Sequence, residues 1–447
     1  MAKLRFPHPL TLLVGCILLA AAASHVLPAG QYERRDDPGT GRRVVVAGTY
    51  HYVAPNPVSA FQALVAIPRG MADAGSVIFL VFLVGGAFTV VDQTGVLRRA
   101  VDWLVRRLQR RAALVIPTAC VAFALGGALE NMGEEIIALV PVLLLLTRRL
   151  GFDALTAVAM SLGAAAVGAA FSPINPFQVG IAQKLAELPL LSGSSFRLGF
   201  LVLALGIWIW GTLRYAARTR SVLQAEDLGP SGPLGVRQGA VLLLVLGTFA
   251  VFVVGIMRLG WDFDQMSALF FLMGVAAGLV GGLRVAGTAE AFVEGFKSMA
   301  YAALLIGFAR AIYVVLDQGR IVDTIVHGLF APIAQLPVAL SALGMMTVQT
   351  AVHFPVPSVS GQAVLTLPVL VPLSDLLGLA RQVTVLAYQY GAGLCELLTP
   401  TNGALMAILA AAGVGYEKWL KFVVPVYLAL AALGIVAIGV GIGIGLK

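Results

Sequence analysis

Charged residues are scarce in this chain. Asp, Glu, Lys and Arg make up 12% of its 447 residues, whereas apolar residues make up 59%. Soluble domains carry about 25% charged residues, so this composition excludes an ordinary soluble enzyme. The few cysteines, Cys16, Cys120 and Cys395, all lie in apolar runs without metal-ligand spacing, and we interpret them as apolar filler.

Motifs of catalysis and of ATP binding are also missing. The sequence holds no His-Glu-x-x-His pair, no nucleophile elbow and no phosphate-binding loop. We therefore predict neither an enzyme nor ATP-driven transport by this chain, and we expect no cofactor. The net charge of +8 is typical of membrane proteins with cytoplasmic Lys and Arg, so no nucleic-acid partner is predicted.

Long apolar runs are what the sequence has instead. A helix needs about 20 residues to cross the hydrocarbon core of a bilayer. Runs that approach or exceed this length are residues 10–27, 76–91, 196–215, 240–256, 266–282, 299–316 and 422–446. They predict an all-α polytopic membrane protein in contact with lipid. A cytoplasmic N-terminus is predicted because most Lys and Arg then lie on the cytoplasmic side. The polar residues 28–57 predict a loop with a short hairpin over 43–53.

Two pairs of apolar runs are too short to span a membrane. Residues 112–125 and 136–146 both have arginine pairs at their outer ends, so they predict a re-entrant hairpin with its tip at residues 130–135. A second pair, residues 338–352 and 363–373, flanks a polar tip at 354–362. Each pair is followed by an apolar run that a proline-containing segment interrupts, at residues 172–176 and 399–403.

The two hairpin regions resemble each other in sequence. A shift of 227 residues places Pro141 on Pro368, Ser172-Pro173 on Thr399-Pro400 and Asn175 on Asn402. An odd number of spans separates the copies, so we predict inverted structural repeats, each with a re-entrant hairpin and a broken helix. Secondary transporters use such repeats for a central site with alternating access. Helix ends at the breaks would direct backbone amides and carbonyls into that site.

Several short runs resemble one transporter family. They are Pro28-Ala29-Gly30-Gln31-Tyr32-Glu33-Arg34, Gly85-Gly86-Ala87-Phe88, Met132-Gly133-Glu134-Glu135, Ser172-Pro173-Ile174-Asn175-Pro176-Phe177, Ser358-Val359-Ser360-Gly361-Gln362-Ala363 and Thr399-Pro400-Thr401-Asn402-Gly403. The chain resembles the YfcC-like transporters, which are grouped with the C4-dicarboxylate anaerobic carriers (DcuC) and related to the p-aminobenzoyl-glutamate transporters (AbgT).

The resemblance implies an architecture as well as a function. It implies an ion-transporter superfamily fold of the elevator type, with a scaffold domain that forms a homodimer and a transport domain of hairpins and broken helices. The implied division is scaffold helices at 1–111, a first hairpin and broken helix at 112–190, scaffold helices and a cytoplasmic linker at 191–337, a second hairpin and broken helix at 338–413, and a last scaffold helix at 414–447. The implied substrates are basic amino acids or C4-dicarboxylates.

Acidic residues at membrane depth are the first candidates for a binding site. Each costs roughly 2.5–3.5 kcal/mol on insertion and usually faces a cavity. The candidates are Glu130, Glu134, Glu135 and Glu396. A structural alternative for Glu134 and Glu135 is that they complement a helix dipole. Arg310 is either a clamp for a substrate carboxylate or the partner of an acid such as Asp317.

Polar residues at the tips and breaks are the second group of candidates. They are Asn131, Ser172, Asn175, Ser358, Ser360, Gln362, Thr399, Thr401 and Asn402. Asn175 and Asn402 bind substrate, hold sodium or simply cap the broken helices. His353 either carries a proton or lines the pocket.

Together these features predict a secondary active transporter of the bacterial cytoplasmic membrane. The substrate is a small metabolite with a carboxylate, and an amino acid, in particular a basic one, is favoured over a C4-dicarboxylate. We expect symport or exchange coupled to H⁺ or Na⁺. A passive channel is the alternative from another class.

Overall fold

The computed structural model describes residues 8–37, 42–96, 99, 114–220, 235–259, 261 and 263–446. The predicted domain boundary between residues 111 and 112 lies outside these residues, and so do residues 221–234, where the basic run from 218 to 237 predicts the cytoplasmic linker. Within them the chain is mainly helical, as its composition predicts, and adds two short antiparallel ribbons.

The first half of the chain builds one helical hairpin and one broken helix. Its elements are α1 (Pro9–Val26), β1 (Gly30–Gln31), β2 (Arg34–Asp37), β3 (Arg42–Val45), β4 (His51–Tyr52), α2 (Ala60–Asp73), α3 (Gly75–Gln93), α5 (Val115–Glu130), α6 (Glu135–Arg149), α7 (Ala154–Val158), η2 (Ala159–Gly163), α8 (Ala164–Ala170), η3 (Pro176–Gly180), α9 (Ile181–Leu185) and α10 (Ser194–Thr219). Helices α5 and α6 form the hairpin, and α7, η2 and α8 continue after a break into η3 and α9.

The second half of the described chain repeats this order of hairpin and broken helix, after four further α-helices and one short 3-10 helix. Its elements are α11 (Val236–Leu259), α12 (Phe263–Gly281), α13 (Arg284–Gln318), α14 (Val322–Phe330), η5 (Ala331–Gln335), α15 (Val338–His353), α16 (Val359–Leu376), α17 (Arg381–Cys395), α18 (Gly403–Ala411) and α19 (Tyr416–Gly443). Helices α15 and α16 form the second hairpin, and α17 and α18 are the two parts of the second broken helix.

Several helices are long and apolar enough to cross a membrane. Among the described residues these are Gly75–Gln93, Ser194–Thr219, Phe263–Gly281, Arg284–Gln318, Val359–Leu376 and Tyr416–Gly443. The prediction of a helical, multi-pass membrane protein is confirmed. Helix α13 begins 15 residues before the predicted start at Met299. Its first turns carry charged residues such as Glu290 and Glu294, which an apolar-run criterion passes over.

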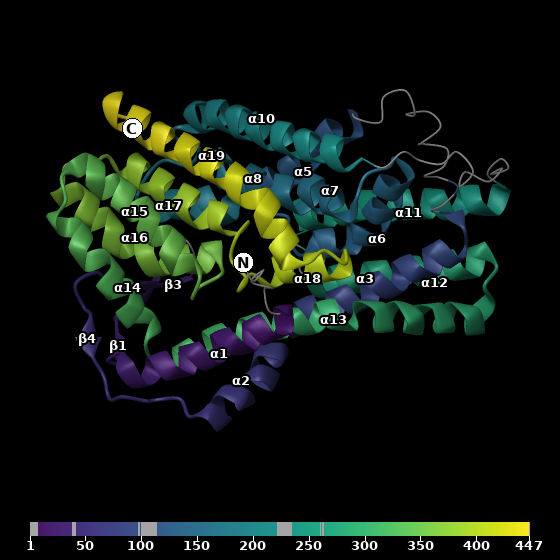
Figure 1. Cartoon of the computed structure of the whole chain (residues 1–447), viewed down its shortest axis with the longest axis horizontal. Helices are drawn as coiled ribbons and strands as arrows, with labels where there is room; N and C mark the ends of the chain where they lie inside the picture. The colour runs from purple at the N-terminus through teal and green to yellow at the C-terminus, as the bar shows by residue number, and fades with distance from the viewer. Residues whose placement is uncertain are drawn as a thin grey trace, which may run out of the picture.

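The long helix α13 lies along one side of the molecule, beside α1, α2, α3 and α12 (Figure 1). Helices α10 and α19 lie on the opposite side, and the hairpins and broken helices fill the space between. Glycines allow the backbones to approach closely. A Cβ on Gly295 of α13 would lie 2.5 Å from the Cα of Gly86 in α3. Small residues at such crossings are the usual means of packing membrane helices.

The hairpins pack on the broken helices in a similar way in both halves. A Cβ on Gly127 of α5 would lie 2.0 Å from the carbonyl oxygen of Ala165 in α8. In the second half, a Cβ on Gly391 of α17 would lie 2.4 Å from the carbonyl oxygen of Met346 in α15. In each half the first hairpin arm therefore touches the first part of the broken helix, and the end of that arm is held beside the break.

The polar loop after α1 pairs differently from the predicted hairpin over 43–53, so that prediction is wrong. Strand β3 pairs with β2, with Asp37 opposite Arg42, and β4 pairs with β1. The β2–β3 pairs are thus nested within the β1–β4 pairs along the chain. Asp323 of α14 fixes this loop: its carboxylate accepts hydrogen bonds from the Arg34 guanidinium at 2.8 Å and from the backbone N–H of Tyr32 at 2.9 Å. This long-range contact explains why local pattern failed to give the pairing.

Candidate functional site

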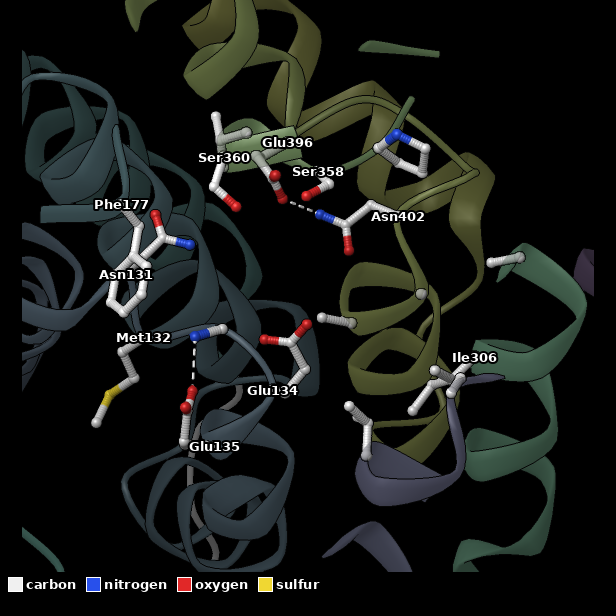
Figure 2. A pocket seen from close by; sticks show the side chains of 18 of the residues that line it. Asn131, Met132, Glu134, Glu135, Phe177, Ile306, Ser358, Ser360, Glu396 and Asn402 are labelled. Carbon is white, nitrogen blue, oxygen red and sulfur yellow. Dashed lines mark hydrogen bonds between the residues drawn. The ribbon is translucent and has the colours of Figure 1, made fainter. Parts of the chain in front are cut away.

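A cavity of about 510 Å³ lies where the two hairpin tips and the second break meet. Its polar and charged lining residues are Asp73, Asn131, Glu134, Glu135, Gln178, Arg310, Ser358, Ser360, Glu396, Thr401 and Asn402. Figure 2 shows the carboxylates of Glu134 and Glu396 pointing into the same space from opposite walls. The cavity therefore collects side chains from parts of the chain more than 250 residues apart, counted from Glu134 to Glu396.

The first tip places two acids at the beginning of α6. Asn131 ends α5 in the left-handed conformation, with φ of 55°, which Asn tolerates better than most residues. The chain then reverses, so that Glu134 and Glu135 meet the N-terminus of α6, where the helix dipole favours negative charge. Glu135 also accepts a hydrogen bond from the Gly133 N–H at 3.0 Å (Figure 2). Both predicted roles of these acids, dipole partner and cavity lining, are compatible with this geometry.

At the first break, Ser172 and Asn175 are fully buried and bind the backbone. The Ser172 hydroxyl donates to the Ala128 carbonyl at 2.7 Å. The Asn175 amide oxygen accepts two backbone N–H bonds at the start of η3, both at 2.9 Å. Its amide nitrogen donates to the Gly127 carbonyl at 2.8 Å. Neither side chain lines the cavity. Both are neutral, and their hydrogen bonds join this break to the end of α5.

The second tip has a similar cap. Ser358 precedes α16 and accepts a hydrogen bond from the Gly361 N–H at 3.2 Å. Ser358 and Ser360 line the cavity, whereas Gln362 is buried behind them. The tip of the second hairpin thus presents two serines to the cavity and has the Gln362 amide buried behind them.

At the second break, an acid takes part in the polar network. Thr401 donates to the Phe354 carbonyl at 2.7 Å, and its hydroxyl lies 2.6 Å from that of Thr399. The Asn402 amide oxygen accepts from a backbone N–H at the start of α18 at 3.1 Å. Its amide nitrogen donates to Oε2 of Glu396 (Figure 2). Asn402 therefore caps a helix as Asn175 does, but its second bond goes to a carboxylate instead of a backbone carbonyl.

His353 completes this second cluster. Its ring is fully buried at the end of α15, and Nε2 lies 3.2 Å from Oε1 of Glu396. Glu396 is 22% exposed and faces the cavity. The imidazole thus lies behind the carboxylate as seen from the cavity.

Arg310 is paired with Asp73, at the end of α2, rather than with Asp317. Both side chains line the cavity and are nearly half-exposed. The guanidinium also lies over the ring of Tyr313, 5.1 Å from its centre. The structural alternative, an ion pair with an acid, is thus present, but the acid is Asp73 instead of Asp317. Helix α2, which the apolar-run pattern does not show, brings Asp73 to the same wall.

The predicted site residues divide into those that line the cavity and those that support its walls. Asn131, Glu134, Glu135, Arg310, Ser358, Ser360, Glu396, Thr401 and Asn402 line the cavity. Ser172, Asn175, Gln362 and Thr399 lie behind the walls, and the side chain of Glu130 is outside the described part of the chain. Sequence reasoning missed Asp73 and Gln178. A capping box at Ser59 and Gln62 marks the start of α2 and is a signal that would have shown that helix.

Acidic residues predominate in the cavity. Its lining has the four carboxylates of Asp73, Glu134, Glu135 and Glu396 and one cation, Arg310. In the part of the chain that the structure describes, no group of three His, Cys, Asp or Glu residues is arranged to hold a metal ion. The four carboxylates of the lining favour a ligand with positive charge.

The similarity to known proteins extends over nearly the whole chain. A model of the C4-dicarboxylate anaerobic carrier family, DcuC, matches residues 6–443. The chain is 32% identical over 466 aligned residues to a putative basic amino acid antiporter, YfcC, of Escherichia coli strain K12, and the match covers 93% of this chain and 92% of that protein. It is 27% identical over 486 aligned residues to an uncharacterized protein of Haemophilus influenzae, with 96% and 95% covered.

Two solved transporters also resemble the chain in structure. The YdaH transporter of Alcanivorax borkumensis has 18% identity and a TM-score of 0.46, over 98% of this chain and 99% of that one. MtrF of Neisseria gonorrhoeae, described as representing a class of antimetabolite efflux pumps, has 17% identity and a TM-score of 0.41, over 97% and 95%.

Proposed function

Because this chain belongs to the C4-dicarboxylate anaerobic carrier family of transporters, we propose that it is a secondary active antiporter for a basic amino acid in the bacterial cytoplasmic membrane. The observation that carries the proposal is the charge of the cavity, in which four carboxylates face a single arginine. A basic amino acid brings a cationic side chain and an α-ammonium group to these carboxylates. A C4-dicarboxylate brings two further negative charges.

Each end of such a ligand would have a partner in the cavity. Glu134 and Glu396 lie on opposite walls and would bind its cationic groups (Figure 2). Arg310 would bind its carboxylate after exchanging Asp73 for it, since a guanidinium pairs well with either carboxylate. The name of the relative in Escherichia coli, a putative basic amino acid antiporter, points to the same class of ligand.

Alternating access, inverted repeats and elevator movement remain parts of this proposal. The equivalent packing of the two hairpins on the two broken helices supports the repeat. A homodimer through the scaffold helices and a cytoplasmic N-terminus are likewise proposed. Both amide oxygens that would hold sodium, those of Asn175 and Asn402, already accept backbone N–H bonds. For this reason we favour H⁺ over Na⁺ as the coupling ion.

Exchange in proteoliposomes tests the proposal directly. Purified protein is reconstituted into liposomes loaded with unlabelled L-arginine, and uptake of external radiolabelled L-arginine is measured. We expect saturable uptake that requires internal arginine, is absent from empty liposomes, and falls at least about tenfold in Glu134→Gln because a carboxylate partner is lost. Asp36→Asn, in the exposed loop ribbon, is the matched control and should keep full uptake.

A C4-dicarboxylate is the second candidate, and the family description together with Arg310 favours it. Succinate replaces arginine on both sides of the membrane in this arm of the experiment. Exchange of succinate without exchange of arginine would overturn the proposed substrate. Uptake that does not saturate and needs no internal substrate would instead indicate a channel.

A further inference from the structure

One exposed face of α10 changes its chemistry along the helix. Near the beginning of α10 this face is aliphatic, with Leu198 52% and Val202 64% exposed. Trp210, 61% exposed, continues the same face, and Arg214 and Arg218 follow at further intervals of four residues, a spacing that keeps side chains on one side of a helix. Because α10 is long and apolar enough to cross a membrane, this order corresponds to the hydrocarbon core, the interface and the headgroup layer of a bilayer.

Helix α19, which lies beside α10, shows the same change in the opposite direction (Figure 1). Lys421 is exposed near its start, and Leu428, 61% exposed, follows two turns later on the same face. Asp153 joins the two helices at this end, because its carboxylate accepts hydrogen bonds from the Tyr215 hydroxyl of α10 and from the Lys418 ammonium of α19, both at 2.8 Å. The cationic end of α10 and the cationic start of α19 therefore lie in one layer.

The acids in this layer do not balance its cations. Lys418 is paired with Asp153, and Lys421 with Glu417. The same layer exposes further arginines, at the end of α6 and at the end of α10. They are Arg148, Arg214, Arg218 and Arg220, and none of them has an ion-pair partner among the described residues. The surface therefore carries an excess of positive charge, which favours an anionic partner.

Two of these arginines lie over aromatic rings. The guanidinium carbon of Arg214 is 5.1 Å from the centre of the Trp210 ring, and that of Arg220 is 5.5 Å from the centre of the Phe152 ring. A guanidinium that lies over a ring presents its N–H donors at its edge, in a planar fork that matches two oxygens of a phosphate. The stacking thus orients these cations for a phosphate group.

The other end of α10 has no such surface. Leu190 and Leu191, which precede the helix, are exposed and aliphatic. Arg197 in its first turn is fully buried, and its guanidinium donates to the amide oxygens of Gln382 and Gln389. Within the described residues, the exposed cations of α10 are therefore confined to the end that adjoins α7 and α19.

We propose that this end of α10 binds the headgroup phosphate of an anionic phospholipid, with Arg214 and Arg218 as its contacts and Lys421 of α19 in the same layer. The acyl chains of the lipid lie along the aliphatic face of α10. A zwitterionic lipid carries its own cation beside the phosphate, so the surface selects an anionic lipid. This inference rests on the membrane location of the chain and not on its substrate, so it stands or falls independently of the proposed function.

Quenching of Trp210 fluorescence by brominated lipids tests the proposal at the site itself. Purified protein is reconstituted into phosphatidylcholine vesicles that contain a rising fraction of either brominated phosphatidylglycerol or brominated phosphatidylcholine. The difference between wild type and Trp210→Phe isolates the signal of Trp210 from that of the other tryptophans. We expect half-maximal quenching at a fraction of phosphatidylglycerol at least about fivefold lower than that of phosphatidylcholine.

Removal of the arginines should remove this preference. Arg218→Gln keeps Arg214 over the Trp210 ring and should weaken the preference about fivefold, and the double variant with Arg214→Gln should show none. Arg43→Gln removes an equally exposed cation from the loop ribbon and is the matched control, which should keep the full preference. Each variant is measured against its own Trp210→Phe partner. Equal quenching by the two lipids in wild type, or an unchanged preference in the double variant, would overturn the proposal.

Inorganic phosphate distinguishes a lipid from a free anion as the source of the phosphate group. The quenching is repeated with sodium phosphate in place of sodium chloride at equal ionic strength. We expect the preference for phosphatidylglycerol to remain, because the acyl chains hold the lipid phosphate at a high effective concentration beside the arginines. Loss of the preference in phosphate but not in chloride would assign the surface to a free anion and overturn the lipid.

Discussion

The two helix breaks of this molecule are capped in the same way, but their capping residues have different second partners. In both, an asparagine caps the second part of a broken helix with its amide oxygen. Asn175 directs its amide nitrogen to the Gly127 backbone carbonyl, and the polar side chains of the first break, Ser172 and Asn175, are buried and neutral. Asn402 directs its amide nitrogen to Glu396, which lies beside His353 and opens on the cavity. The asparagine of the first break therefore bonds only backbone groups, whereas that of the second break also holds a carboxylate that lines the cavity.

The starts of the two broken helices differ in their caps. Asp153 caps α7 and accepts further hydrogen bonds from Tyr215 and Lys418, both at 2.8 Å. The position 227 residues later is Ala380, which precedes α17 without a side-chain cap. The first broken helix is thus tied to α10 and α19 through its capping residue. The second is tied to α10 by the side chain after its start, because Gln382 accepts a hydrogen bond from the Arg197 guanidinium at 2.9 Å.

Asn175→Ala should have the largest effect, and on stability. The substitution removes a helix cap and leaves the buried Gly127 carbonyl without its donor, so we expect a loss of about 2–3 kcal/mol. Thermal unfolding of the detergent-purified variant measures this. The amount of exchange per folded molecule should change little. Wild-type stability in this variant would show that the first break is not a rigid support.

Glu134→Gln should have the next largest effect, and on ligand binding. The variant loses a carboxylate that faces the second break, so the affinity for L-arginine should fall about tenfold, or about 1.4 kcal/mol. The stabilisation of the folded protein by arginine in a thermal-shift titration reports the affinity. An unchanged titration would mean that the cationic group binds elsewhere, and Asp36→Asn serves again as the control.

Asn402→Ala should cost less stability than Asn175→Ala. It loses a cap worth about 1 kcal/mol. The Glu396 carboxylate that loses its donor is partly exposed to the cavity and can bind water instead, whereas the Gly127 carbonyl cannot. Thermal unfolding of both detergent-purified variants measures the difference. Equal losses of stability would mean that the two breaks do not differ in the way described above.

The smallest effect is expected for Asp153→Asn. Partial burial would raise the pKa of Asp153, but hydrogen bonds from Lys418, Tyr215 and Thr156 outweigh it and lower the pKa below its usual value. This contribution to stability is present above the unfolded pKa and is lost as pH falls through the folded pKa. Because asparagine still caps the helix, the variant should lose only about 0.5 kcal/mol at neutral pH. Its difference in melting temperature from wild type should disappear in acid.

The sequence predicts the helical elements of this protein well because membrane helices satisfy their own backbone. An apolar run of sufficient length has few alternatives in a bilayer, and prolines with polar neighbours mark where a helix stops. The hairpins and the breaks at 172–176 and 399–403 accordingly lie where the pattern predicts them. The apolar-run pattern failed to predict α2 and the strand pairing of the loop ribbons. Both depend on partners distant in sequence.

Candidate site residues were predicted by type and position, but not by what each one contacts. Ser172 and Asn402 belong to corresponding motifs, yet one supports the wall and the other lines the cavity. Asp73 entered the site because helix α2 ends beside α13, which no local pattern indicates. Local sequence determines where a helix must end and which residue caps it. Only the tertiary structure decides whether the remaining hydrogen bond of that cap goes to a backbone carbonyl or to a carboxylate, because the partner comes from a different part of the chain.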